Sequence, residues 1–208
     1  SYSDLITYTS NANDLRNCDV VYISKDVATD DYGNSFIDDV DALVELTKLN
    51  VNLNCTIVVL CQVLPGFTRQ KSINCNMFYQ VETLIFGEAY HRAMYPERLI
   101  IGCSTPKEKL PRPYKIFLEA YNCPIHQMSY ESAELAKISI NLMLISSLTM
   151  ANKLGRLCEE IGANWNDALN GFAADGRIGD SHLNVPGHDG KLGYGGTCFP
   201  KDIWIFKQ

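Results

Sequence analysis

The residues with the clearest capacity for chemistry lie near the end of the chain, between Gly193 and Asp202. Cys198 follows flexible glycines, and Pro200 is typical of a helix start, where backbone amides and the positive helix end favour a thiolate. Lys201 and Asp202 add a cation and a carboxylate. The pattern therefore predicts a cysteine nucleophile. The alternative is a buried cysteine beside a structural glycine turn, but such a turn needs no Lys-Asp pair.

A second pair of polar side chains, Lys137 and Asn141, is spaced by four residues and would share one face of a helix. Apolar residues surround both, so the ammonium would be partly desolvated and able to orient an oxyanion. A lysine that extends its ammonium out of an apolar interface is the structural alternative.

The elements that must position these residues begin with short apolar runs in the first half of the chain. Each run is nearly continuously apolar, as strands covered on both faces of a parallel sheet are. Apolar residues at a helical period separate the first two, and this order is typical of a doubly wound α/β sheet. The expected strands are 19–23, 56–60, 98–102 and 124–126, and the expected helices are 36–49 and 113–121.

From Glu131 to Ile161 the sequence contains no Pro and a single Gly, and apolar residues surround the whole helix that it predicts. Such a helix is buried in a core or in a subunit interface. The Gly-rich tail from Asp175 onward is expected to form an ordered loop, followed by a short helix after Pro200. The fold class is therefore α/β, a parallel sheet followed by an all-α unit on one long helix.

Composition excludes several classes of function. With 46% hydrophobic and 20% charged residues the chain is expected to pack as a globular protein. A net charge of -6 argues against nucleic-acid or membrane-surface binding. We expect neither a signal peptide nor a membrane span. The eight cysteines form no C-x-x-C pair, which argues against a metal site and favours a reducing, cytoplasmic compartment.

Several motifs together resemble the UDP-glucose/GDP-mannose dehydrogenase family. The most specific is Gly-Gly-Thr-Cys-Phe-Pro-Lys-Asp, which ends at Asp202, and it is joined by the helix 132–141 and by Arg177-Ile178-Gly179. Weaker matches are 65–69, and Glu82 followed by 95–99. These motifs run in family order over almost the whole chain.

The resemblance implies a partial NAD-binding Rossmann-like domain over residues 1–128 and a helical central and dimerisation domain over 129–208. It also implies NAD as cofactor, a UDP-sugar substrate and a homodimer formed through the long helix 131–161. The dinucleotide fingerprint G-x-G-x-x-G is absent, and so is the family's third, nucleotide-binding domain. The chain is therefore expected to be a middle part of a longer family protein.

The same resemblance implies the catalytic roles. In the family an alcohol at C6 of the sugar is oxidised twice, from UDP-glucose to UDP-glucuronate. Cys198 would form a thiohemiacetal and then a thioester, while Lys137 and Asn141 would hold the oxyanion. Asp202 would position or activate water, and Glu82 matches an acid-base glutamate for thioester hydrolysis.

Binding roles are implied in the same way. Cofactor-binding residues would be Lys201, Ser24 and Gln62. The loop 189–195 would wrap the sugar nucleotide, and Arg177 matches an arginine that reaches the neighbouring subunit's substrate. The substrate-binding residues would be Glu82, Thr83, Leu84, Lys137, Asn141, Arg177, Lys191, Tyr194 and Gly195.

Some positions depart from the family pattern. Cys61-Gln62 replaces a Ser-Thr pair, Phe86 replaces a second glutamate, and Val27-Ala28 replaces a Thr-Pro pair. These changes fall on the cofactor side and on the hydrolytic step, so the half that bears the thiol is the better preserved.

Other functions remain open from the sequence alone. GDP-mannose or a UDP-N-acetylhexosamine could be the substrate. A cysteine acyltransferase or hydrolase would need a histidine base near Cys198, for which His182 and His188 are in range, but it would not need the Lys137-Asn141 pair. A pseudoenzyme or dimerisation module that keeps the long helix is the non-enzymatic alternative.

Overall fold

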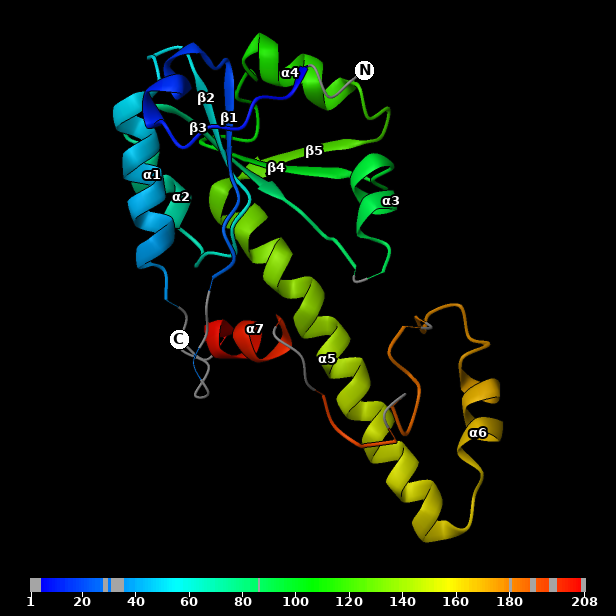
Figure 1. The fold of residues 1–208 in the computed structure, drawn as a ribbon. Helices are drawn as coiled ribbons and strands as arrows, with labels where there is room; N and C mark the ends of the chain where they lie inside the picture. The colour runs from blue at the N-terminus through cyan, green and yellow to red at the C-terminus, as the bar shows by residue number, and fades with distance from the viewer. Residues whose placement is uncertain are drawn as a thin grey trace. The chain divides into compact units, whose positions relative to one another are not determined.

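A computed structural model describes residues 5–27, 30, 36–85, 87–179, 181–187, 190–194 and 198–206. Its centre is a five-stranded sheet in the order β1-β2-β3-β4-β5 (Figure 1). The strands are β1 Val20–Ile23, β2 Thr56–Val59, β3 Asn76–Val81, β4 Leu99–Cys103 and β5 Ile125–Ser129.

Helices connect these strands and form the rest of the regular structure in the described chain. The 3-10 helix η2 precedes β1, and the 32-residue helix α5 follows directly on β5 (Figure 1). The bounds are η2 Ala12–Asn17, α1 Asp38–Asn50, α2 Phe67–Lys71, α3 Ala89–Met94, α4 Arg112–Glu119, α5 Tyr130–Ile161, α6 Trp165–Phe172 and α7 Cys198–Phe206.

The α/β class and the long helix are confirmed, but the prediction of an all-parallel sheet is wrong at one junction. β1, β2 and β3 are parallel to one another, whereas β4 runs antiparallel to β3 and parallel to β5. Strand β3 itself was not predicted. The connection between β3 and β4, which contains the short helix α3, does not cross over the sheet. Strand β4 therefore begins beside the end of β3 and runs in the opposite direction.

Both faces of the sheet are covered, because alternate residues of the strands enter two different cores. On one face Ile57 and Tyr79 pack with Val40 and Val44 of α1 and with Ala133 of α5. On the other face the core is formed with α4. Its buried residues are Val58, Phe78, Leu99, Ile101, Cys103, Leu110, Tyr114 and Leu118. This two-sided burial explains why the predicted strands read as continuous apolar runs.

The described chain divides into two compact units, and the division falls at Lys137 in α5. The first unit contains the sheet, with α1 to α4 and the first turns of α5. The second unit contains the rest of α5 with α6 and α7.

Helix α5 has an apolar surface on more than one side. Ile138, Ile145 and Cys158 are buried, whereas Met143 and Met150 are 68% and 57% exposed. By length and composition alone the helix is apolar enough to cross a membrane, which was not predicted from the sequence. Only 22% of its most apolar 18-residue stretch is buried. Core helices of soluble proteins meet the same criterion.

Helix α7 begins at Cys198, two residues before the predicted start at Pro200. A proline is tolerated in the first helical turn, because the amide that it lacks would have no helical acceptor there. Cys198 therefore belongs to the first turn of the helix and does not precede it.

Gly102 in β4 permits the start of α5 to lie against the sheet. A Cβ at this position would come within 3.0 Å of the Cβ atoms of Ala133 and Tyr79 and within 3.2 Å of the Cα of Tyr130. Contacts of this length are tighter than most Cβ contacts, so a side chain here would require the neighbouring atoms to move by a few tenths of an ångström.

We predict that Gly102→Ala lowers the free energy of unfolding by about 1–3 kcal/mol, since it overpacks a rigid junction. Denaturant unfolding followed by circular dichroism measures the change. Gly171→Ala in α6 is the matched control, because nothing lies within 4 Å of the place that its added methyl group would occupy. An unchanged stability of Gly102→Ala would show that the junction is loose.

Candidate functional site around helix α5

A buried carboxylate fixes the start of α5 to the turn after β2. The two side-chain oxygens of Glu134 accept hydrogen bonds from the backbone amides of Gly66, at 2.6 Å, and of Thr68, at 2.9 Å. Gly66 has a φ of 97° at the N-cap of α2, a conformation that favours glycine. Burial raises the pKa of Glu134, and the hydrogen bonds from Thr68 and Gly66 oppose that shift.

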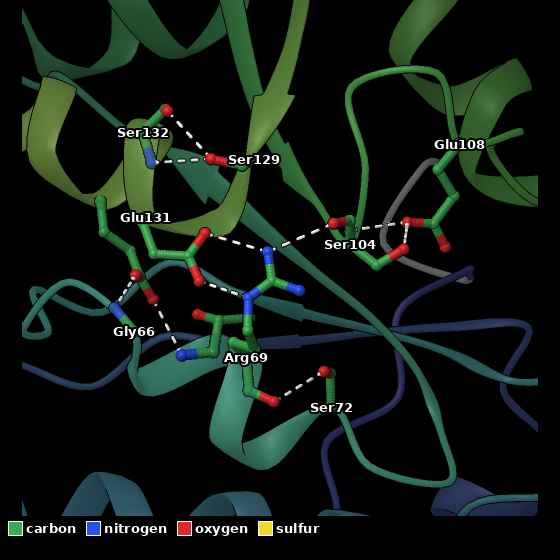
Figure 2. Close-up of polar contacts among 10 residues, drawn as sticks. Gly66, Arg69, Ser72, Ser104, Glu108, Ser129, Glu131 and Ser132 are labelled. Carbon is green, nitrogen blue, oxygen red and sulfur yellow. Dashed lines mark hydrogen bonds and ion pairs between the residues drawn. The ribbon is translucent and has the colours of Figure 1, made fainter.

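An ion pair beside this carboxylate makes a second link between α2 and α5. Figure 2 shows Arg69 between Glu131 and Ser104, and its guanidinium also lies 5.2 Å from the centre of the Tyr130 ring. One guanidinium nitrogen donates to the backbone carbonyl of Ser104 at 3.2 Å. The hydrogen bond from Arg69 is the main cause that lowers the pKa of Glu131 to about 2.

Lys137, one turn beyond Glu134, reaches the segment that follows β3. Its Nζ donates to the backbone carbonyl of Glu82 at 2.9 Å. The structure thus brings together two predicted catalytic residues, although the contact is to the main chain of Glu82 and not to its carboxylate. Glu82, Thr83 and Leu84 lie outside any strand or helix.

Asn141, one turn further along α5, contacts the helix that begins with the predicted nucleophile. Its side-chain amide donates a short hydrogen bond to a carboxylate oxygen of Asp202. Asp202 and its neighbour Lys201 are both buried, whereas Cys198 is exposed at the start of α7. Because Cys198 and Asp202 are four residues apart, they lie on the same side of α7.

Several residues expected to bind the sugar nucleotide contact residues that are near them in the sequence. Arg177 is exposed and forms a forked ion pair with Asp175. The backbone carbonyl of Lys191 accepts from the amide of Gly187 at 3.0 Å. The Tyr194 ring lies 6.4 Å from that of Phe199. Gly195 lies outside the described residues, as do Phe86 and Ala28.

Two of the predicted cofactor residues share one edge of the sheet. Ser24 follows β1 and Gln62 follows β2, and these parallel strands are paired up to Ile23 and Val59. Open α/β sheets bind dinucleotides at the carboxyl ends of their parallel strands. The position of both residues fits one part of an NAD site, and the glycine fingerprint that would cradle the pyrophosphate is absent from the chain.

Cys61, which replaces a serine of the family pattern, has a structural role at this edge. Its sulfur accepts from the amide of Lys25 at 3.2 Å and donates to the carbonyl of Ile23 at 3.5 Å. Burial raises the pKa of the Cys61 thiol, which keeps it neutral. The thiol therefore joins the ends of β1 and β2 as a hydroxyl could.

Of the two histidines that could act as the base of a cysteine hydrolase, the structure describes one. The His182 ring lies 5.7 Å from that of Phe199, next to Cys198 in the sequence. Its Nδ1 is 2.6 Å from the hydroxyl of Ser181. His188 lies outside the part of the chain that the structure describes.

Comparison with known proteins identifies the relationship. Residues 131–208 match the model of the UDP-glucose/GDP-mannose dehydrogenase family, central domain. A UDP-glucose 6-dehydrogenase of Rickettsia typhi is 30% identical over 97% of this chain and 47% of its own length. The chain belongs to the UDP-glucose/GDP-mannose dehydrogenase family. It spans about half the length of the curated relatives that it matches.

Solved structures of dehydrogenases share the fold. A UDP-glucose dehydrogenase from Pyrobaculum islandicum superposes with a TM-score of 0.82 at 23% identity, over 99% of this chain and 49% of that one. A UDP-D-ManNAc dehydrogenase from Pyrococcus horikoshii gives a TM-score of 0.80 at 18% identity, over 95% and 48% of the two chains. The mixed sheet followed by one long helix is thus shared with about half of each of these structures.

Two residues of this family member have roles that the sequence did not suggest. Glu134 lies in the helix motif that resembles the family. A carboxylate among the apolar residues of a helix indicates that it is buried and hydrogen-bonded, but the sequence did not show to which group. Arg92 donates from its Nε to the backbone carbonyl of Thr83 at 2.9 Å, and its sequence context gave no signal.

The Arg69–Glu131 pair predicts how stability depends on pH. The native state holds the pKa of Glu131 at about 2, below its ordinary value of 4.5. The pair therefore stabilises the fold above pH 4.5, and this contribution is lost as the pH falls toward 2. Because both side chains are more than a third exposed, 46% and 41%, we expect at most about 1 kcal/mol.

Arg69→Met should accordingly lower the free energy of unfolding at pH 7, and the difference from the wild type should shrink as the pH falls from 5 to 3. Denaturant unfolding at several pH values measures this difference. A difference that stays constant over this range would show that Arg69 stabilises the fold by packing on Tyr130 instead.

Proposed function

We propose that the protein takes part in the NAD-dependent oxidation of a nucleotide sugar, with UDP-glucose as the leading substrate and UDP-glucuronate as product. The observation that supports this most is the hydrogen bond between Asn141 and Asp202. It joins the family's helix motif to its cysteine motif. The contact between Lys137 and Glu82 adds a second pair of residues that the reaction needs.

The chemistry proceeds through the exposed thiol at the start of α7. When bound, NAD supplies the hydride acceptor for both oxidations. The C6 alcohol first loses a hydride and a proton to become the aldehyde. The thiolate of Cys198 adds to this aldehyde to give a thiohemiacetal oxyanion, and loss of a second hydride from C6 gives a thioester. Attack of water on the thioester carbonyl then breaks the carbon–sulfur bond, releasing the carboxylate and the thiolate.

Four other side chains act on this intermediate. The ammonium of Lys137 and the amide of Asn141 donate hydrogen bonds to the oxyanion at C6. Asp202, whose carboxylate already accepts from Asn141, positions the attacking water. Glu82 accepts a proton from that water and releases it to solvent after the thiolate has left, while the product acid loses the second proton as it ionises.

The remaining predicted residues hold the reactants. Ser24, Gln62 and Lys201 contact NAD. The sugar nucleotide is bound by the segment after β3 and by the glycine-rich loop, with Arg177 reaching the substrate of a neighbouring subunit. The substrate-binding residues in this proposal are Glu82, Thr83, Leu84, Lys137, Asn141, Arg177, Lys191, Tyr194 and Gly195. GDP-mannose and UDP-N-acetylhexosamines remain alternative substrates, which the assay below compares.

The cellular setting belongs to the same proposal. All eight cysteines fall within the described residues and none forms a disulfide. We place the protein in a reducing compartment, the cytoplasm, because thiols persist there.

Substitution of the thiol tests the reaction. We expect the full-length protein to form NADH from NAD and UDP-glucose, and Cys198→Ser to lower kcat by about 10³-fold or more, since the nucleophile is lost. NADH absorbance measures the rate, and the same assay with GDP-mannose and a UDP-N-acetylhexosamine identifies the substrate.

The matched control is Cys18→Ser, which changes a partly buried thiol of the first unit and should keep wild-type activity. Equal activity of Cys198→Ser and the wild type would refute the covalent mechanism. Lack of turnover by the wild type with every nucleotide sugar would favour a non-catalytic dimerisation role.

Dimerisation through α5 is proposed on independent grounds. Met143, Met150 and Leu157 are spaced by seven residues and are 68%, 57% and 46% exposed. A seven-residue spacing keeps these side chains on one side of the helix. This apolar stripe is what a helix in a symmetric subunit interface presents.

A charge in the stripe should therefore dissociate the dimer. We expect Met150→Glu to shift the sedimentation coefficient from that of a dimer to that of a monomer, because an unpaired carboxylate would be buried between subunits. Leu53→Glu, at an exposed position of the first unit, is the control and should stay dimeric. A wild-type protein that sediments as a monomer would rule out this interface.

A further inference from the structure

Two cationic side chains hold successive backbone carbonyls of the segment that follows β3, residues 82–85. Lys137 Nζ donates to the carbonyl of Glu82, and Arg92 Nε donates to the carbonyl of Thr83, each at 2.9 Å. Lys137 already has a role in the proposed reaction. Arg92 has none.

The 82–85 segment depends on such contacts, because it has no regular secondary structure. Its far end is closed by the amide of Glu88, which donates to the carbonyl of Ile85 at 3.0 Å. Leu84 and Ile85 are exposed, so the core does not hold them. The carbonyls of Glu82 and Thr83 are therefore fixed from outside the segment.

The geometry of Arg92 suits this task. It lies on α3, and a second guanidinium nitrogen pairs with Glu97 at 3.5 Å. Glu97 also pairs with Arg98 at 3.2 Å. The planar guanidinium, held by Glu97 on one nitrogen, directs its Nε–H at the Thr83 carbonyl.

Arg92 lies beside a surface pocket. A cavity of about 230 Å³ is lined by Thr83, Arg92, Glu97 and Arg98, among others. On this side of the segment, the contact that holds the Thr83 carbonyl is the hydrogen bond from Arg92.

We propose that Arg92 is a positioning residue, which sets the 82–85 segment so that Glu82 and the backbone of Thr83 and Leu84 meet the sugar nucleotide. This inference rests on the proposed function, which assigns Glu82 to thioester hydrolysis. Arg92 does not itself touch the reacting atoms.

Substitution of Arg92 by Met in the full-length protein removes the hydrogen bond while keeping an unbranched side chain. We expect kcat to fall by about 10- to 100-fold, as for a small displacement of a catalytic group. If hydrolysis is the slowed step, a thioester adduct should accumulate on Cys198, visible by intact-protein mass spectrometry. Amide hydrogen exchange over residues 82–85 should become faster.

Two further variants separate positioning from general damage. Arg98→Met removes the other arginine that pairs with Glu97 but leaves both hydrogen bonds to the segment in place, and it should behave as the wild type. Arg92→Lys can still donate one hydrogen bond and should recover part of the lost kcat. A merely structural role would give neither the adduct on Cys198 nor this recovery.

The outcomes distinguish this inference from the function on which it rests. If the wild type turns over while Arg92→Met matches Arg98→Met in rate and in hydrogen exchange, Arg92 has no positioning role. Arg92→Met could instead speed exchange in the segment although the wild type oxidises no nucleotide sugar. The proposed function and the catalytic role of Arg92 would then both be wrong, but Arg92 would still be shown to fix the position of the segment.

Discussion

The arrangement of the candidate site depends on the buried carboxylate of Glu134. It accepts hydrogen bonds from two backbone amides at the start of α2 and so ties the first turns of α5 to the turn that follows β2. A buried carboxylate is costly unless its oxygens are satisfied, so the start of the helix has one favourable position relative to this turn. Lys137 follows one turn later on the same helix, so the position of Glu134 also sets the position from which Lys137 donates to the Glu82 carbonyl.

The sequence predicted those parts of the fold in which one physical signal dominates. Composition alone predicts strands that are buried on both faces, and it predicts a 32-residue helix that contains no proline. Strand β3 did not, because Asn76 and Gln80 interrupt its apolar residues and leave only Met77, Phe78 and Tyr79 in sequence. The reversal at β4 was not predictable either, since strand direction depends on the path of the connection and not on the composition of the strand.

The candidate site was predictable where the chemistry requires particular residue types at a fixed spacing. Cys198, Asp202 and the pair on α5 could be chosen on that basis. Arg92 could not, because it acts through a backbone carbonyl, and any neighbouring donor of sufficient length could do the same. The role of Cys61 also needed the structure: this thiol, which stands where the family pattern has a serine, links the ends of β1 and β2. The sequence showed only a departure from the family pattern, whereas the structure gives this thiol two hydrogen-bonding partners.

The distribution of the cysteines has a practical consequence. Of the eight thiols, all of them within the described residues, Cys198 alone is exposed, whereas the others are partly or fully buried. Burial also raises the pKa of Cys55, Cys61, Cys75 and Cys103, which slows their reaction with electrophiles. A maleimide dye or spin label added to the native protein would therefore be directed to the first turn of α7, so that spectroscopic probes can be attached there without removing any other cysteine.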